Sequence, residues 1–212
     1  MVHGSAIGSR EKPESRRWVE LLLNEGLAVL VYDRRGEGES ADGPPDVRFE
    51  SLSADALAAA RTLAKETGVP RDRVGMMGGS QAAWIAAAAA ARSKDVAFLI
   101  LTGVPAVTPG EQERQSVEHR MLAAGMAHDA IEDALAYTGL YFYCVRLGGA
   151  GEAFDALLEA GRRAEETEWA DFVSIPAAPE HLHWWRDHHD FDMRQALGAR
   201  AETPMPAIWG EA

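Results

Sequence analysis

The segment that most restricts the fold of this chain spans residues 73–91, RVGMMGGSQAAWIAAAAAA. A short apolar run comes first, a glycine-rich turn with one serine follows, and a long alanine-rich stretch comes last. The apolar run is typical of a strand buried on both faces, and alanine is the strongest helix former. The pattern therefore predicts a strand at 74–77, a sharp turn at Ser80 and a helix at 81–92.

The alternation of strand and helix extends to both sides of this segment. Residues 27–32 (LAVLVY) and 96–102 (VAFLILT) are short, nearly continuous apolar runs, which indicate buried strands. Residues 14–24 and 52–67 have the apolar periodicity of helices. Alternating strands and helices favour a mostly parallel sheet with right-handed crossovers, so the predicted fold class is α/β.

The alternation stops near residue 105. Helices without intervening strands are predicted at 111–124, 128–147 and 151–167, and a strand returns at 205–209. The stretch 169–192 contains two prolines, which argue against a helix there. We therefore predict an N-terminal part of an α/β core at 1–104, a helical insertion at 105–192 and a return to the core at 193–212.

The composition is that of an acidic globular protein. Hydrophobic residues make up 47% of the chain, enough to form a buried core. The net charge of -12 argues against nucleic-acid and anionic-membrane partners, because both attract basic surfaces. No run is long enough to cross a membrane, and the first residues show no export signal. The single cysteine, Cys144, excludes an internal disulfide, so a reducing, cytoplasmic location is expected.

Ser80 is the candidate nucleophile. A serine on a tight strand-to-helix turn is raised at the carboxyl edge of the sheet, where open α/β folds bind ligands. Small neighbours at Gly78 and Ala82 prevent clashes between the turn and the flanking elements. The free N–H of Gln81, at the start of the next helix, points at an oxyanion formed on the serine. The alternative is that Ser80 only caps that helix.

Two further segments fit the same site. His3-Gly4-Ser5 lies where the loop after a preceding strand belongs. Such a loop supplies a second oxyanion donor, the backbone N–H of Ser5, and Gly4 allows the backbone to approach the substrate. His3 is predicted to support this loop of the site. The alternative is that His3 is a frayed terminal residue. Residues 32–40 (YDRRGEGES) are interpreted as a turn organised by their Asp, Ser and Gly residues, without a catalytic role.

In this order and spacing, four segments resemble the α/β-hydrolase superfamily: HGS (3–5), YDRRGEGES (32–40), GGSQAAWIA (78–86) and FLILTGVP (98–105). More narrowly, they are similar to bacterial serine hydrolases of the esterase and serine-aminopeptidase-like type, in which a helical lid follows the sixth strand. One departure from the family is Ala82, where glycine is usual.

The resemblance implies a hydrolase without a cofactor, with Ser80 as nucleophile and the N–H groups of Gln81 and Ser5 as the oxyanion hole. It implies a small acyl substrate: a carboxylic ester, or alternatively a peptide or an acyl-CoA thioester. It also implies a catalytic Asp just after the WGE segment at 209–211, and a His further on. Both are expected beyond Ala212, so the chain looks truncated at its two ends. A third alternative is accordingly an inert fragment, and exposed sheet edges favour self-association.

The segment 180–192 (EHLHWWRDHHDFD) gathers four of the seven histidines. A triad histidine from this segment is one alternative, because a triad is defined by geometry, and a metal site is another. The spacing matches no standard zinc pattern, so we expect no metal. Trp184, Trp185 and Phe191 are instead expected to pack the lid or to line an apolar pocket. The chain has neither a dinucleotide fingerprint nor a P-loop, so no cofactor is expected.

Overall fold

The computed structural model describes residues 1–5, 8–41, 47–198 and 202–208. The chain folds as two units, one of Met1–Ala106 with Asp192–Ala212 and the other of Val107–Phe191. Each unit encloses buried apolar side chains of its own. Among the described residues, every helix is too short or too polar to cross a lipid bilayer.

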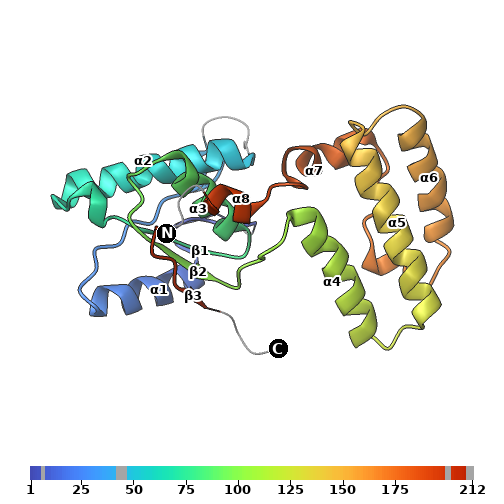
Figure 1. Ribbon diagram of the computed structural model, residues 1–212, viewed down its shortest axis with the longest axis horizontal. Coiled ribbons are helices and arrows are strands. Elements are labelled where there is room, and N and C mark those ends of the chain that lie inside the picture. Colours follow the sequence, from blue (N-terminus) through green and yellow to red (C-terminus); the bar gives the residue numbers. More distant parts are fainter. Residues whose placement is uncertain (6–7, 42–46, 199–201, 209–212) are drawn as a thin grey trace. The chain divides into compact units, whose positions relative to one another are not determined.

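The first unit contains a three-stranded parallel sheet in the order β1-β2-β3 (Figure 1). The strands are β1 (Met76–Gly79), β2 (Leu99–Thr102) and β3 (Ala207–Ile208). β1 and β2 pair from Met76 opposite Leu99 to Gly79 opposite Thr102. Because the strands are parallel, their carboxyl ends meet at one edge of the sheet, and the turn that follows β1 emerges there.

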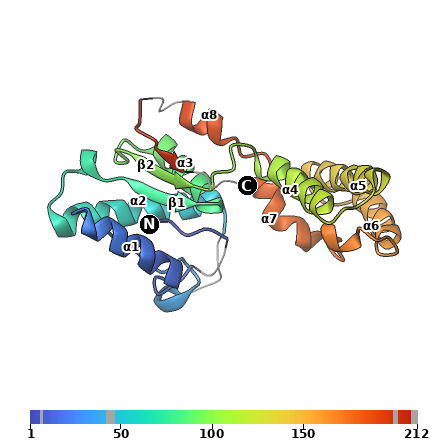
Figure 2. The same cartoon turned by 90° about the horizontal axis from the view of Figure 1, so that it is seen from below.

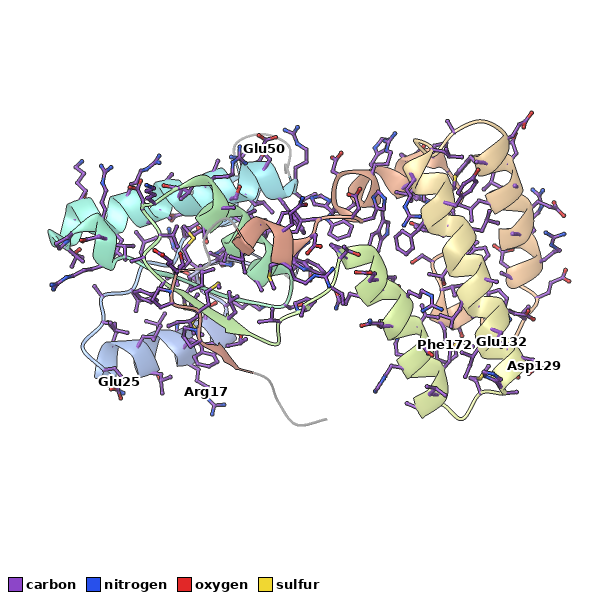
Figure 3. All side chains as sticks on the ribbon, in the orientation of Figure 1. Arg17, Glu25, Glu50, Asp129, Glu132 and Phe172 are labelled. Atoms are coloured by element: carbon purple, nitrogen blue, oxygen red, sulfur yellow. The ribbon has the colours of Figure 1, made fainter. Side chains whose placement is uncertain are left out.

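Helices cover both sides of this sheet. The helical segments are α1 (Pro13–Asn24), η1 (Gly38–Ser40), α2 (Phe49–Thr67), η2 (Arg71–Arg73), α3 (Gln81–Arg92) and α8 (Met193–Gly198). α3 packs on the sheet and against α2 and α8, whereas α1 lies on the other side of the sheet (Figure 1). Glu50, at the start of α2 (Figure 3), pairs with Arg92 at the end of α3, with 2.9 Å between Oε1 and Nη2.

The helix predicted at 81–92 is confirmed as α3. Its residues from Gln81 to Ala90 are all buried, and most of them are alanines. A helix that is buried on every face is apolar all around its axis. The short alanine side chains also let it lie close to its neighbours. The close approach fixes the start of α3 directly against the end of β1.

The prediction of a strand at 27–32 is wrong, because the structure assigns no regular strand there. The segment lies beside the N-terminal residues, where the Met1 amine donates to Leu30 O at 2.7 Å. On the other side, Val2 N donates to Met77 O at 2.8 Å. These are single hydrogen bonds, and a regular ladder needs a repeated series of them. Residues 1–3 therefore lie between the 27–32 segment and β1.

The second unit is helical, with α4 (Pro109–Ala123), α5 (His128–Arg146), α6 (Glu152–Ala164), η3 (Ala170–Phe172), η4 (Pro179–Leu182) and α7 (His183–His188). α4, α5 and α6 pack successively against one another (Figure 2). A capping box starts α4: Glu111 N donates to Thr108 Oγ1 at 3.2 Å, and Thr108 N donates to Glu111 Oε2 at 2.9 Å.

The prediction that the stretch 169–192 lacks helix is wrong, because α7 lies within it. Pro179 occupies the first position of η4, where a backbone N–H has no helical partner in any case. Proline therefore begins the helical turn at this position and does not break it. The aromatic residues that follow are held by packing within the unit.

Replacement of Ala86 by leucine tests the close packing of α3. Ala86 has no exposed surface, so the added carbon atoms have no room, and we expect the free energy of unfolding to fall by about 1–3 kcal/mol. Ala58→Leu, at an exposed position inside α2, is the matched control and is expected to change stability by less than about 0.5 kcal/mol. Denaturant unfolding followed by circular dichroism measures both. Equal effects of the two substitutions would contradict the packing argument.

Candidate active site

Ser80 lies on the turn between β1 and α3, at the carboxyl edge of the sheet. Its φ of 53° and ψ of -129° make it the one non-glycine residue with positive φ in the described part of the chain. A residue with a Cβ atom adopts this conformation only under strain. Two backbone hydrogen bonds hold it, from Ser80 N to Thr102 O at 3.1 Å and from Ala83 N to Ser80 O at 2.9 Å.

The Ser80 side chain is exposed and makes no capping hydrogen bond to α3. The alternative that Ser80 serves only as a helix cap therefore has no support in the structure. An exposed hydroxyl on a strained turn, beside the start of a buried helix, is the arrangement that a nucleophile elbow requires.

The glycines before Ser80 leave no space for a side chain. A methyl group built on Gly78 would lie 2.6 Å from Ala82 O, and one built on Gly79 would lie 2.6 Å from Thr102 Oγ1. Both distances are far shorter than van der Waals contact. A side chain at position 78 would push on the backbone of Ala82, and one at position 79 would displace the Thr102 side chain.

The predicted oxyanion segment runs next to this turn. A methyl group built on Gly4 would lie 3.4 Å from Gly79 O and 3.6 Å from Ala82 N, so the Gly4 backbone lies against the elbow. Ser5, the next residue, is exposed. Gln81, the other predicted donor residue, is the first residue of α3, where backbone N–H groups have no partner within the helix. The structure thus brings Gly4, Ser80 and Gln81 together.

His3 is buried, and its side chain contacts Tyr32, at the end of the 27–32 segment. Its Nε2 makes a hydrogen bond with Tyr32 O, and its ring meets the Tyr32 ring edge-on, with 5.2 Å between centroids. Burial lowers the pKa of the imidazole, since the charged form loses its hydration, and the hydrogen bond to Tyr32 offsets part of that effect. His3 is the only histidine in the sequence of the first unit, and these contacts anchor the N-terminal residues to Tyr32.

In the 180–192 segment, two histidines are exposed and two are buried. His188 stacks on Trp184 at 4.6 Å between centroids, and its Nδ1 bonds Trp184 O. His189 stacks on Phe142 at 6.3 Å and its Nδ1 bonds Trp185 O at 3.0 Å, while its Nε2 is buried without a partner among the described residues. In the whole of the chain that the structure describes, no three His, Cys, Asp or Glu side chains gather as a metal site.

Trp185 is partly buried and packs against the core of the second unit, where it meets the Phe142 ring edge-on with 5.0 Å between centroids. The predicted WGE segment, with Glu211, lies outside the described residues.

An apolar cavity of about 300 Å³ lies elsewhere in the first unit. Side chains of the 27–32 segment, α2 and β1 line it, among them Leu30, Leu63 and Met76. Neither Ser80 nor Gln81 is among the lining residues, so this cavity does not hold a substrate at the candidate nucleophile.

The model of the X-Pro dipeptidyl-peptidase (S15) family matches residues 5–192, which is most of the chain. The chain belongs to this family. S15 proteins are serine hydrolases of the α/β-hydrolase superfamily, and the parallel sheet with its strand–turn–helix at Ser80 is compatible with that fold. None of the curated proteins matches the chain.

The strain at Ser80 predicts an unusual order of stability among variants. Ser80→Gly removes the Cβ atom that makes positive φ costly, whereas Ser80→Ala keeps it. We expect the glycine variant to be more stable than the alanine variant by about 1 kcal/mol, although both lack the hydroxyl. Denaturant unfolding of the two proteins measures the difference. An alanine variant as stable as the glycine variant would show that the turn is unstrained.

The buried imidazole of His3 predicts a pH dependence of stability. Because its pKa is lowered in the folded protein, the unfolded chain binds a proton more readily below the usual histidine pKa of 6.5. The free energy of unfolding should therefore fall between pH 7 and pH 5, and His3→Gln should reduce this fall. Unfolding curves of both proteins at the two pH values measure the difference. The other titrating groups are common to both proteins, so their effect cancels in the comparison. Equal losses in wild type and variant would contradict the assignment.

Proposed function

We propose that the chain is a cofactor-independent serine hydrolase that uses Ser80 as its nucleophile. The Ser80 Oγ attacks the carbonyl carbon of the substrate, and the N–H groups of Gln81 and Ser5 stabilise the negative charge that develops on the carbonyl oxygen. The leaving group departs with a proton, and an ester forms between the acyl group and Ser80. Water then attacks this ester and releases the acid.

One observation carries the proposal: Ser80 holds a positive φ of 53° at an exposed turn, with Gly4 against the same turn. Strain of this kind costs on the order of 1–3 kcal/mol and is concentrated at functional sites. A serine that merely linked a strand to a helix would gain nothing from it, because glycine would serve better.

Membership of the S15 family favours a peptide substrate over the ester that the sequence motifs suggest. The activity for which the family is described is that of an X-Pro dipeptidyl-peptidase. A peptide and an ester pass through the same acyl-enzyme, so Ser80 and the two N–H groups serve either bond. We propose an X-Pro peptide as the first substrate to test, a small carboxylic ester as the second, and the helical unit as the lid that selects between them.

Attack by the Ser80 hydroxyl requires a base that takes its proton. His3 is held by Tyr32 O and is therefore not proposed for this role. The histidines of the 180–192 segment are the alternative within this chain. Serine reacts with an acyl or phosphonyl group at a useful rate only when a base assists it, so reaction at Ser80 reports whether the chain has one.

An alkyl fluorophosphonate tests the proposal directly. We expect it to label the wild-type chain at Ser80, as located by mass spectrometry of the digested protein, and to leave Ser80→Ala unlabelled. Ser93, which follows the other end of α3, is the matched control: Ser93→Ala should be labelled like wild type. Absence of labelling in the folded wild-type chain would overturn the proposal in favour of an inert protein.

The substrate class is read from two chromogenic compounds. Release of p-nitroaniline from Ala-Pro-p-nitroanilide supports the peptidase, and release of p-nitrophenol from p-nitrophenyl acetate alone supports the esterase. Because p-nitrophenyl acetate also reacts without an enzyme, only the part lost in Ser80→Ala counts. If the chain is labelled, replacement of each histidine of the 180–192 segment by glutamine identifies a base within that segment.

A further inference from the structure

Two side chains of the 32–40 turn bind backbone groups of Gly4, within the predicted oxyanion segment, and of Gly8. Arg34 Nη1 donates to Gly4 O at 2.8 Å, and Arg34 Nη2 donates to the Glu37 carboxylate. The same carboxylate accepts from Gly8 N, and Arg34 N donates to Gly8 O at 2.7 Å. Arg34 and Glu37 thus form a clamp on Gly4 and Gly8. The sequence alone indicates no part for these two side chains in the site.

The clamp is closely packed. The side chains of Arg34 and Glu37 are only 11% and 22% exposed. A methyl group built on Gly8 would lie 2.5 Å from Arg34 Cβ, so only glycine allows this approach. The third guanidinium nitrogen, Nε, is buried and has no partner among the described residues, so the two Nη atoms make the contacts that hold the group. Partial burial strengthens these contacts relative to an exposed ion pair.

The contact with Gly4 O also fixes the N–H of Ser5. The two groups belong to the same peptide unit, which is planar and trans, so they point in opposite directions. A guanidinium that grips the oxygen therefore sets the direction of the N–H. Its positive charge polarises the peptide further and makes that N–H a better donor. The Gly4 backbone, in turn, lies against the elbow that carries Ser80.

We propose that Arg34, held by Glu37, is a positioning residue that orients the Ser5 N–H toward the oxyanion formed at Ser80. This inference rests on the proposed function, since the oxyanion exists only if Ser80 is acylated or phosphonylated. Arg34 does not touch the reacting atoms. It acts through the peptide group that it grips, and its loss should weaken stabilisation of the transition state more than binding of the reagent.

Arg35 provides a matched control in the same turn. Its guanidinium makes a two-point contact with Asp55 of α2, at 2.6 Å from Nε and 2.5 Å from Nη2. It is thus also an arginine paired with a carboxylate, but this pairing ties the turn to α2 and not to Gly4 or Gly8. A general effect of removing a guanidinium from this turn would appear in Arg35→Met as well as in Arg34→Met.

The test compares two readouts in the wild-type chain and in both variants. The first is the maximal rate at which an alkyl fluorophosphonate labels Ser80, together with the reagent concentration that gives half of that rate. For Arg34→Met we expect a maximal rate about 10- to 100-fold lower, a half-saturating concentration changed less than about 3-fold, and no loss in Arg35→Met. The second readout is amide hydrogen exchange over residues 1–10, which should become faster in Arg34→Met alone.

Two further variants separate positioning from folding. Glu37→Gln keeps the shape of its side chain but removes the charge that holds Arg34, so it should slow labelling in the same sense even if Arg34→Met does not fold. Arg34→Lys can still donate to Gly4 O and should recover part of the rate, whereas a lysine has no planar fork for the second contact. A variant that merely loosened the fold would not be rescued in this way.

Each outcome decides the inference. Labelling of the wild-type chain combined with wild-type rates in Arg34→Met and Glu37→Gln overturns the positioning role and leaves the proposed function standing. The same holds if Arg35→Met slows labelling as much as Arg34→Met. Unchanged hydrogen exchange in Arg34→Met shows that the clamp does not hold the segment and overturns the inference without reference to activity. No labelling of the wild-type chain is the separate failure of the proposed function.

Discussion

The hydrogen bond from Ser80 N to Thr102 O is the interaction on which the rest of the site depends. It continues the pairing of β1 with β2 for one residue beyond the strand, so the chain must reverse direction within a single residue to begin α3. The strained backbone of Ser80 is the cost of that reversal, on the order of 1–3 kcal/mol. Burial of nearly the whole of α3 offsets it, because a helix without polar faces has no favourable place other than against the sheet.

From this constraint the remaining geometry follows in steps. Glycine at 78 and 79 avoids a displacement of Ala82 and Thr102, which occupy the space of a side chain at these positions. The first residues of α3 then lie at the edge of the sheet, where the first N–H groups of a helix have no acceptor four residues before them in the helix. A second backbone segment completes the arrangement only if it also comes close, and Gly4 does so.

Local sequence is sufficient to predict part of this structure. The helix at 81–92 follows from alanine content alone, and the turn at Ser80 follows from glycines between two strongly apolar elements. The absence of a regular strand at 27–32 is not predictable, because hydrophobicity records burial but not whether neighbouring backbones are in register. The proline at 179 misleads because its effect depends on where a helical turn starts. The Arg34 clamp joins residues 30 positions apart, so no pattern within the 32–40 turn reveals it.

That separation also bears on how the site assembles. The polar contacts of the clamp all lie within the first 37 residues, so they are available to a nascent chain before the strand that leads to Ser80 has been made. The entropy lost in closing a loop grows only slowly with its length, so the separation of Gly4 and Gly8 from Arg34 and Glu37 adds little to the cost of forming these hydrogen bonds. Ser80, by contrast, needs Thr102 of β2, further along the chain, for the hydrogen bond that holds its conformation. In the order of synthesis, the clamp residues of the candidate site therefore precede the residue that bears the hydroxyl.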